Sequence, residues 1–226
     1  MRIPRIPLPL TAVSVFTLGL LAVPQTAQAQ IPVLCSESSL VTAINMANAE
    51  GGDTLALAPF CTYRLTSAHG DAGNGAVGLP PITTPITLLG IGVTIVRDPS
   101  APDFRILEVD GGVNVPGADG DLTLVGVTVS GGSAVEPYPG GGIANFGGSV
   151  SVLSSSVTNN TAVAGGGIYT DRGTVSLNAS DVSGNRADTG GGIYENSGSV
   201  SLFLTTVSGN SPDNCAPAGS VPGCSG

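Results

Sequence analysis

The strongest constraint on the fold of this chain is an internal repeat with a period of 25 residues. Residues 149–173 read SVSVLSSSVTNNTAVAGGGIYTDRG, and residues 174–198 read TVSLNASDVSGNRADTGGGIYENSG. A partial third copy covers residues 199–210, and an earlier copy begins at Leu122 with three extra residues before its GGGI. Fixed periods of this length are typical of solenoids, in which each repeat forms one coil. We therefore expect regular coils over residues 122–210.

Each repeat carries short runs in which aliphatic and polar residues alternate. Val150, Val152 and Val157 of one copy recur as aliphatic residues in the next two copies. Alternation within β-branched runs, separated by Gly, Ser and Asn, predicts two or three short strands per repeat. One coil buries too few side chains to fold alone, so equivalent strands must pair in parallel between coils. The sequence thus predicts an all-β parallel solenoid.

An asparagine recurs directly after a strand in three successive repeats, as Asn160, Asn185 and Asn210. An amide there can bend the chain and bond to the same amide in the next coil, which predicts a structural ladder. A row of ligand-binding amides is the alternative interpretation. A leucine-rich repeat also places Asn after a strand, but here no Leu follows the Asn and no helix completes the repeat.

The N-terminus has the order of a secretory signal peptide: two arginines, an apolar stretch over residues 8–23 and a small-residue AQA motif. Removal of residues 1–29 would leave residues 30–226 as one exported domain. The apolar stretch is too short for a confident membrane span, and no second one follows. We expect the mature chain to be secreted, and either extracellular or associated with the cell surface.

Less regular coils precede the repeats. Residues 38–49 predict the one helix, because Leu40, Ile44 and Ala47 share one face and two glycines follow. Placed beside the first coil, this helix would act as a cap, so residues 30–61 are expected to hold the cap and the first strands. Further strands are predicted at residues 54–58, 86–89, 93–96 and 104–109.

The four cysteines form one pair near each end of the exported chain, Cys35 with Cys61 and Cys215 with Cys224. In an oxidising compartment they predict two disulfides, and this local pairing is the simplest one, although sequence does not fix the connectivity. A zinc site is the alternative, but neither pair has the spacing of a zinc knuckle and the chain has one histidine. Residues 211–226 would then form a C-terminal disulfide loop.

The GGGIY…G.VSL..S.VSGN pattern resembles the bacterial right-handed parallel β-helix repeat proteins of the pectate-lyase-like superfamily. The resemblance covers residues 35–226. It implies a right-handed parallel β-helix with a short N-terminal capping helix. Its functional implication is broad, because the superfamily contains lyases, hydrolases and adhesins.

A polysaccharide lyase would need a basic residue beside carboxylates that hold calcium. The best candidates are Arg97 and Arg105, which lie close in sequence to Asp98 and Asp103, and ion pairs at a loop rim are the alternative. Asp181 has no second acid in its repeat column, which disfavours the paired carboxylates of a glycoside hydrolase. We therefore assign no catalytic residue.

Two further sets of polar residues are candidates for a metal site or a catalytic site. Asp171, Asn196 and the neighbouring Glu195 could hold a cation such as calcium, although the glycine that follows indicates a solvated bend. His69 lies in a glycine-rich insertion with no serine in a strained elbow, so a nucleophilic triad is not expected. We expect neither a cofactor nor a dedicated metal site.

The candidate binding residues are Tyr169 and Tyr194. Because Ile168 and Ile193 should point inward, strand alternation sends both tyrosines outward, stacked about 4.8 Å apart. Sugars pack well on such rings, and the alternative is that the stack only stabilises the sheet. Ala144 interrupts this column on the preceding coil.

The formal net charge of −9 makes nucleic acid and anionic membranes poor partners. The sequence favours a secreted, non-catalytic β-helix scaffold for surface attachment or polysaccharide binding, with an extracellular polysaccharide or cell-surface glycan as partner. A small polysaccharide lyase or glycoside hydrolase is the alternative. Capped ends would make the protein a monomer.

Overall fold

The computed structural model describes residues 30–134 and 136–225, which form one helix and sixteen short strands. Every strand pairs in parallel with its neighbours, so the fold is all-β with parallel sheets, as the repeat predicted. The expected signal peptide, residues 1–29, lies outside the described residues. Within the described residues no helix is long and apolar enough to cross a membrane.

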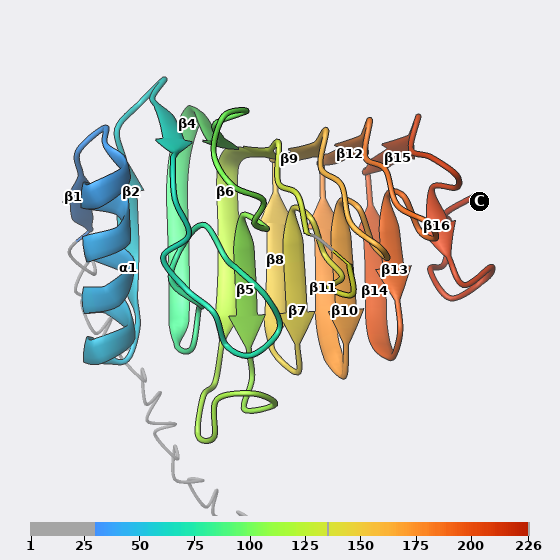
Figure 1. Cartoon of the computed structure of the whole chain (residues 1–226), viewed down its shortest axis with the longest axis horizontal. Coiled ribbons are helices and arrows are strands. Elements are labelled where there is room, and N and C mark those ends of the chain that lie inside the picture. The colour runs from blue at the N-terminus through green and yellow to red at the C-terminus, as the bar shows by residue number, and fades with distance from the viewer. Residues whose placement is uncertain (1–29, 135, 226) are drawn as a thin grey trace, which may run out of the picture.

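The strands stack in three rows along the long axis of the molecule (Figure 1). The first row contains, in hydrogen-bonded order, β1 (Ile31–Val33), β2 (Asp53–Leu57), β4 (Pro85–Arg97), β6 (Asp121–Ser130), β8 (Ser149–Leu153), β11 (Gly173–Asn178) and β14 (Gly198–Phe203). The second row contains β3 (Thr62–Leu65), the later halves of β4 and β6, β9 (Ser156–Thr158), β12 (Asp181–Ser183) and β15 (Thr206–Ser208). The third row is a separate sheet of β5 (Leu107–Asp110), β7 (Ile143–Phe146), β10 (Ile168–Asp171), β13 (Ile193–Glu195) and β16 (Cys215–Ala216).

The register between coils follows the sequence period. Val157 pairs with Val182, and Val182 pairs with Val207 in the coil after it. Between β6 and β8 the offset is larger, because Leu122 pairs with Val150. The three extra residues of the earlier copy are therefore taken up outside the strands, and the in-register pairing of aliphatic residues is kept.

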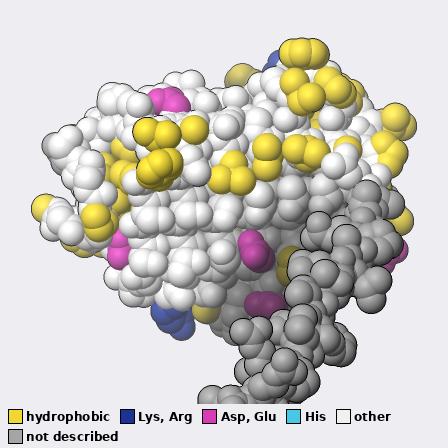
Figure 2. Space-filling model, turned by 180° about the vertical axis from the view of Figure 1, so that it is seen from behind, with side chains coloured by type: hydrophobic (Ala, Val, Ile, Leu, Met, Phe, Trp, Pro, Cys, Tyr) yellow, Lys and Arg dark blue, Asp and Glu magenta, His cyan; other side chains and the backbone are white. Residues whose placement is uncertain are grey.

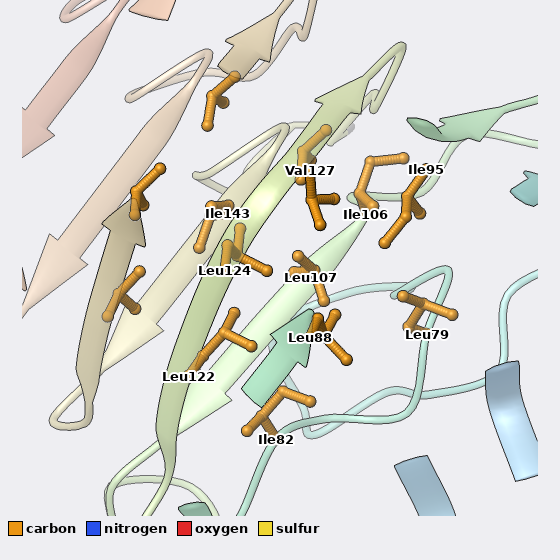
Figure 3. Close-up of a cluster of buried hydrophobic side chains, with 14 of the residues drawn as sticks. Leu79, Ile82, Leu88, Ile95, Ile106, Leu107, Leu122, Leu124, Val127 and Ile143 are labelled. Carbon is orange, nitrogen blue, oxygen red and sulfur yellow. The ribbon is translucent and has the colours of Figure 1, made fainter. Parts of the chain in front are cut away.

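The core lies between the two sheets. Aliphatic side chains from β4, β5, β6 and β7, among them Leu88, Leu107, Leu124 and Ile143, point toward one another and are fully buried (Figure 3). Alternation along each strand sends every second side chain inward, so each coil adds one layer to this core. Truncating one of these leucines to alanine should cost about 2–5 kcal/mol.

The helix α1 (Glu37–Glu50) is one residue longer at each end than the sequence indicated. Ser36 caps its N-terminus by accepting a 3.2 Å hydrogen bond from the backbone N–H of Ser39, and Gly51 ends it in a left-handed conformation with φ 89°. Leu40 and Ile44 are buried against the first strands. The helix therefore closes the N-terminal end of the core (Figure 1).

Both local cysteine pairs form disulfides, which confirms the predicted pairing. Cys35–Cys61 joins the segment before α1 to the turn before β3, with 5.7 Å between the two Cα atoms. Cys215–Cys224 closes the last loop, with 6.2 Å between the Cα atoms. In a chain-entropy estimate each crosslink contributes roughly 2–4 kcal/mol.

Three predicted strand ranges differ from the structure. The strand predicted at residues 54–58 begins and ends one residue earlier, as β2. Residues 86–89 and 93–96 belong to one strand, β4, whose register shifts between Leu89 and Val93 as it bends from the first row to the second. Gly92 allows this bend with a φ of +63°. Residues 104–106 precede β5 rather than belonging to it, because the chain there pairs with the long loop before β4 through a single bridge at Arg105.

Candidate functional site

The outer face of the third row carries the candidate site. Ile143, Ile168 and Ile193 point inward and are fully buried, so the residue after each of them points outward. These outward residues are in register and form one line, which we call the outer column: Glu108, Ala144, Tyr169, Tyr194 and Ala216.

The two tyrosines of the outer column stack on each other. The ring centres of Tyr169 and Tyr194 are 5.8 Å apart and their planes differ by 11°. This separation is larger than the rung spacing of about 4.8 Å, so the rings are offset from each other. Both side chains are partly exposed to solvent.

A third aromatic ring, Phe146, contacts this stack from a buried position and was not predicted from the sequence. Its ring centre lies 5.8 Å from that of Tyr169, with the planes tilted by 51°. Phe146 lies two residues after Ala144 on the same strand, so it also points outward. Phe146 has no aromatic residue at the equivalent position of the next repeats, so the repeat pattern did not indicate it. The alternation of side chains along the strand from Ala144 does predict that Phe146 points outward.

Polar groups flank the aromatic rings at the ends of the strands. Asp171 accepts hydrogen bonds from Asn196 Nδ2 at 2.9 Å and Ser197 Oγ at 2.8 Å, and it forms an ion pair with Arg172 at 2.9 Å. Partial burial opposes the ionisation of Asp171, but these partners outweigh it and lower the pKa of the carboxyl. The carboxylate is therefore held in a fixed position beside the stack.

The predicted cation-binding trio is only partly assembled. Asp171 and Asn196 are in contact, but Glu195 is in register with Thr170, a fully buried residue of the inward-facing line. Burial raises the pKa of Glu195. Among the described residues no group of three or more His, Cys, Asp and Glu side chains is placed to hold a metal ion.

At the N-terminal end of the same sheet the outer column is covered. Glu108 and Arg105 are both fully buried, and Arg105 Nη1 donates a hydrogen bond to Glu108 Oε2. Arg105 Nη2 donates to the backbone carbonyl of Asn74, which lies in the loop between β3 and β4. This covering loop, residues 66–78, passes in front of the sheet (Figure 1).

The buried pair is electrostatically perturbed in both members. Burial lowers the pKa of the Arg105 guanidinium, and Glu108 opposes this shift. Burial raises the pKa of Glu108, and Arg105 opposes that shift in turn. The guanidinium carbon of Arg105 also lies 5.9 Å from the ring centre of Phe146, so the covered pair adjoins the aromatic stack.

The four residues proposed for lyase chemistry do not form one cluster. Asp98 pairs with Arg64 at 3.4 Å, while Arg97 lies 3.9 Å from Asp103. Arg105 turns toward the covering loop instead. Asp98 also accepts two hydrogen bonds from Ser100, which fixes it in a tight turn. These residues are close in sequence, but their side chains make separate contacts.

His69 has a structural contact at the start of the covering loop. Its Nε2 lies 2.8 Å from Glu37 Oε1, and the same carboxylate accepts hydrogen bonds from the backbone and hydroxyl of Thr66. Glu37 belongs to the first turn of α1. The helix and the covering loop are therefore tied together at the N-terminal end.

The three repeat asparagines are hydrogen-bonded to one another along the coils. Asn160 Nδ2 donates to Asn185 Oδ1 at 3.0 Å, and Asn185 Nδ2 donates to Asn210 Oδ1 at 3.0 Å. Each amide also donates to a carbonyl of the preceding coil, as Asn185 does to Val157 at 2.9 Å. Asn214 continues the line beyond Asn210. The donors and acceptors of the inner amides are thus used within the fold.

Comparison with protein-family models, curated proteins and solved structures finds no match for this chain.

Proposed function

We propose that this protein is a secreted, non-catalytic scaffold that binds an extracellular polysaccharide on the outer face of its third row of strands. The proposal treats the three rows as faces of a right-handed parallel β-helix. Parallel strands joined by crossovers are right-handed in nearly all proteins, which supports that hand. The GGGIY repeat and its resemblance to pectate-lyase-like β-helices support the same architecture.

The observation that carries the proposal is the offset stack of Tyr169 and Tyr194. An aromatic ring offers a flat apolar face to the C–H groups of a sugar and a polar edge to its hydroxyls. Asp171 and Asn196 lie beside the stack and can exchange hydrogen bonds with those hydroxyls. The two tyrosines occupy equivalent positions of successive coils, and such a repeated pair suits a polymer, whose units also repeat.

The charge of the chain indicates the class of polymer. The formal net charge is −9, so an acidic polysaccharide would be repelled unless a cation bridged the two. A neutral polysaccharide meets no such barrier. We therefore propose a neutral extracellular polysaccharide or cell-surface glycan as the main ligand, with acidic polymers bound only in the presence of calcium.

A second candidate function, a small polysaccharide lyase or hydrolase, has one observation in its favour. Arg105 and Glu108 stand on the same face as the aromatic stack, and burial raises the pKa of Glu108 toward the range of a general acid. Both side chains are fully buried under residues 66–78, so the covering loop would have to open before a substrate could reach them.

The test is size-exclusion chromatography of a panel of neutral and acidic polysaccharides, each run alone and with the purified protein. Parallel runs contain calcium or a chelator. Co-elution of the protein with a neutral polymer of unchanged size is the expected result. A shift of the polymer to smaller fragments would overturn the non-catalytic proposal and favour the lyase or hydrolase, whereas separate elution from every polymer would contradict polysaccharide binding.

Export has its own test. N-terminal sequencing of the protein recovered outside the cell should show that the chain begins at Gln30. A chain that keeps residues 1–29, or that stays inside the cell, would contradict the proposed signal peptide and the proposed site of action.

A further inference from the structure

Two of the three rows end in an open edge at the C-terminal side. β14 pairs with β11, and β15 pairs with β12, but within the described residues no strand pairs with the other edge of either one. The disulfide-closed loop adds β16 to the third row alone. The last coil is therefore covered on one row and uncovered on the other two (Figure 1).

The open edge carries two large apolar side chains that are exposed to solvent. Phe203 is 63% exposed and Leu204 is 78% exposed at the corner between β14 and β15. One coil earlier the same two positions hold Asn178 and Ala179. Two coils earlier the Phe203 position holds Leu153, which is partly buried, so the last coil differs in how far its apolar corner is exposed.

The core is less closed beneath this edge. Leu202 and Val207 point inward but are only partly buried, whereas Leu177 and Val182 at the same positions one coil earlier are fully buried. Apolar surface therefore remains in contact with water at this end. Covering it would be favourable at about 25 cal/mol for each Å².

Edge strands that must stay unpaired usually contain a charge, a proline or a bulge. β14 reads GSVSLF and β15 reads TVS, so neither strand carries a charged residue or a proline. Both pair without a register shift with the coil before them. Nothing in these two strands opposes the addition of a further strand.

The N-terminal end is built differently. The edge strand β1 has three residues with Pro32 at its centre, which has no N–H to donate, and α1 closes the core beside it. Exposed apolar side chains also occur there, namely Leu34, Met46, Phe60 and Ile91. Figure 2 shows apolar groups toward both ends of the molecule. Within the described residues β3 also has no strand on its outer edge, but it carries the charged Arg64, whereas the open edges at the C-terminal end carry no charge.

We propose that two copies of this chain associate through their open C-terminal edges about a twofold axis. An axis through the corner at Phe203 and Leu204 brings these residues of the two copies into contact. The same rotation lays β14 of one copy antiparallel to β15 of the other, so both open edges gain hydrogen bonds at once. Each copy has one such end, so the assembly closes as a dimer.

The charge distribution predicts how this dimer depends on salt. The pairing strands are uncharged, while the whole chain carries a formal charge of −9. Two copies therefore repel each other at long range and attract each other only in contact. Added salt screens the repulsion, so dimerisation should strengthen as the salt concentration rises.

The test is sedimentation velocity of the purified protein over a wide concentration range at low and high salt, after mass spectrometry has established where the chain begins. We expect a monomer–dimer equilibrium that shifts toward the dimer with salt. The double variant Phe203→Lys, Leu204→Lys should weaken the dimer at least a hundredfold. Asn178→Lys, in the same column one coil earlier, is the matched control and should leave the dimer unchanged.

A second variant separates association from folding. Leu204 has a left-handed φ of 49°, which Asn tolerates better than Leu, so Leu204→Asn should keep the fold and still weaken the dimer. A monomer at every concentration and salt would overturn the proposal. A dimer that survives the Phe203 and Leu204 variants, or a species that grows beyond the dimer, would overturn it as well.

Discussion

The outer face of one sheet is covered at its N-terminal end and partly exposed to solvent at Tyr169 and Tyr194. In β5 the outward residue is Glu108, which pairs with Arg105 beneath the covering loop. In β10 and β13 the residues of the same outer column are Tyr169 and Tyr194, which stack on each other in partial contact with solvent. The backbone and register of the column are the same throughout.

Outward residues at equivalent positions of the same sheet therefore have different roles, depending on which other segment of the chain covers them. A charged residue under a loop must be paired and becomes part of the interior. The side chains of Tyr169 and Tyr194 are partly exposed instead, so a ligand can contact them. The covered pair Arg105 and Glu108 therefore belongs to the irregular coils, whereas Tyr169 and Tyr194 belong to the regular repeats.

The largest expected effect is on the covered side. Arg105→Ala leaves the Glu108 carboxylate buried without its partner, so the free energy of unfolding should fall by about 3–5 kcal/mol. Chemical denaturation measures this loss. The double variant Arg105→Met, Glu108→Leu removes both charges and is the control, because it should recover most of the stability. An unchanged midpoint for Arg105→Ala would show that the covering loop does not depend on the pair.

Substitutions in the asparagine ladder of the regular repeats should cause the next largest loss of stability. Asn185→Ala leaves the Val157 carbonyl and the Asn160 amide without their buried partners, which should cost roughly 2–4 kcal/mol. Asn210→Ala, at the half-exposed end of the line, should cost less, about 1 kcal/mol. Thermal unfolding of the two variants compares them directly. Equal losses of stability would show that burial does not determine how much each asparagine contributes to the free energy of unfolding.

A smaller effect with a defined pH dependence is expected where the covering loop begins. Burial tends to raise the pKa of Glu37, but hydrogen bonds from Thr66 and His69 outweigh it and lower the pKa below the ordinary value. Glu37→Gln should therefore destabilise the protein at pH 7 by about 1 kcal/mol. Because the carboxylate contributes only when ionised, the difference from wild type should vanish as the pH falls through that lowered pKa.

Glu50→Gln, at the exposed end of the same helix, is the matched control for this titration. Denaturation midpoints of the three proteins from pH 7 to pH 3 give the comparison. A gap between Glu37→Gln and wild type that persists at pH 3 would contradict a role for the ionised carboxylate.

The smallest effect on stability should come from substitutions in the stack of Tyr169 and Tyr194. Tyr169→Ala removes one stacked ring from an outward position, and such pairs contribute about 0.5–1.5 kcal/mol. Thermal unfolding should therefore show a shift of a few degrees. A loss as large as that for Arg105→Ala would show that the stack belongs to the structural interior and not to a free surface.

The sequence predicted the repeated part of the molecule well, because each repeat tests the assignment of the next. The in-register aliphatic residues, the parallel pairing and both disulfides are confirmed. The covered region was not predicted, because nothing in the residues around Arg105 shows which loop will lie over them. The contact of Phe146 was not predicted for a related reason, since Tyr169 lies in another coil and at another repeat position.

Polysaccharide binding at Tyr169 and Tyr194 can be tested by measuring the affinity of the Tyr169→Ala, Tyr194→Ala double variant for the polysaccharide that co-elutes with the wild-type protein. Isothermal titration with that polymer compares wild type, the double variant and Phe60→Ala, which removes an exposed ring at the other end of the molecule. We predict at least a tenfold loss of affinity for the double variant and none for Phe60→Ala. Equal affinity for all three proteins would contradict the proposal that the surface at Tyr169 and Tyr194 binds the polysaccharide.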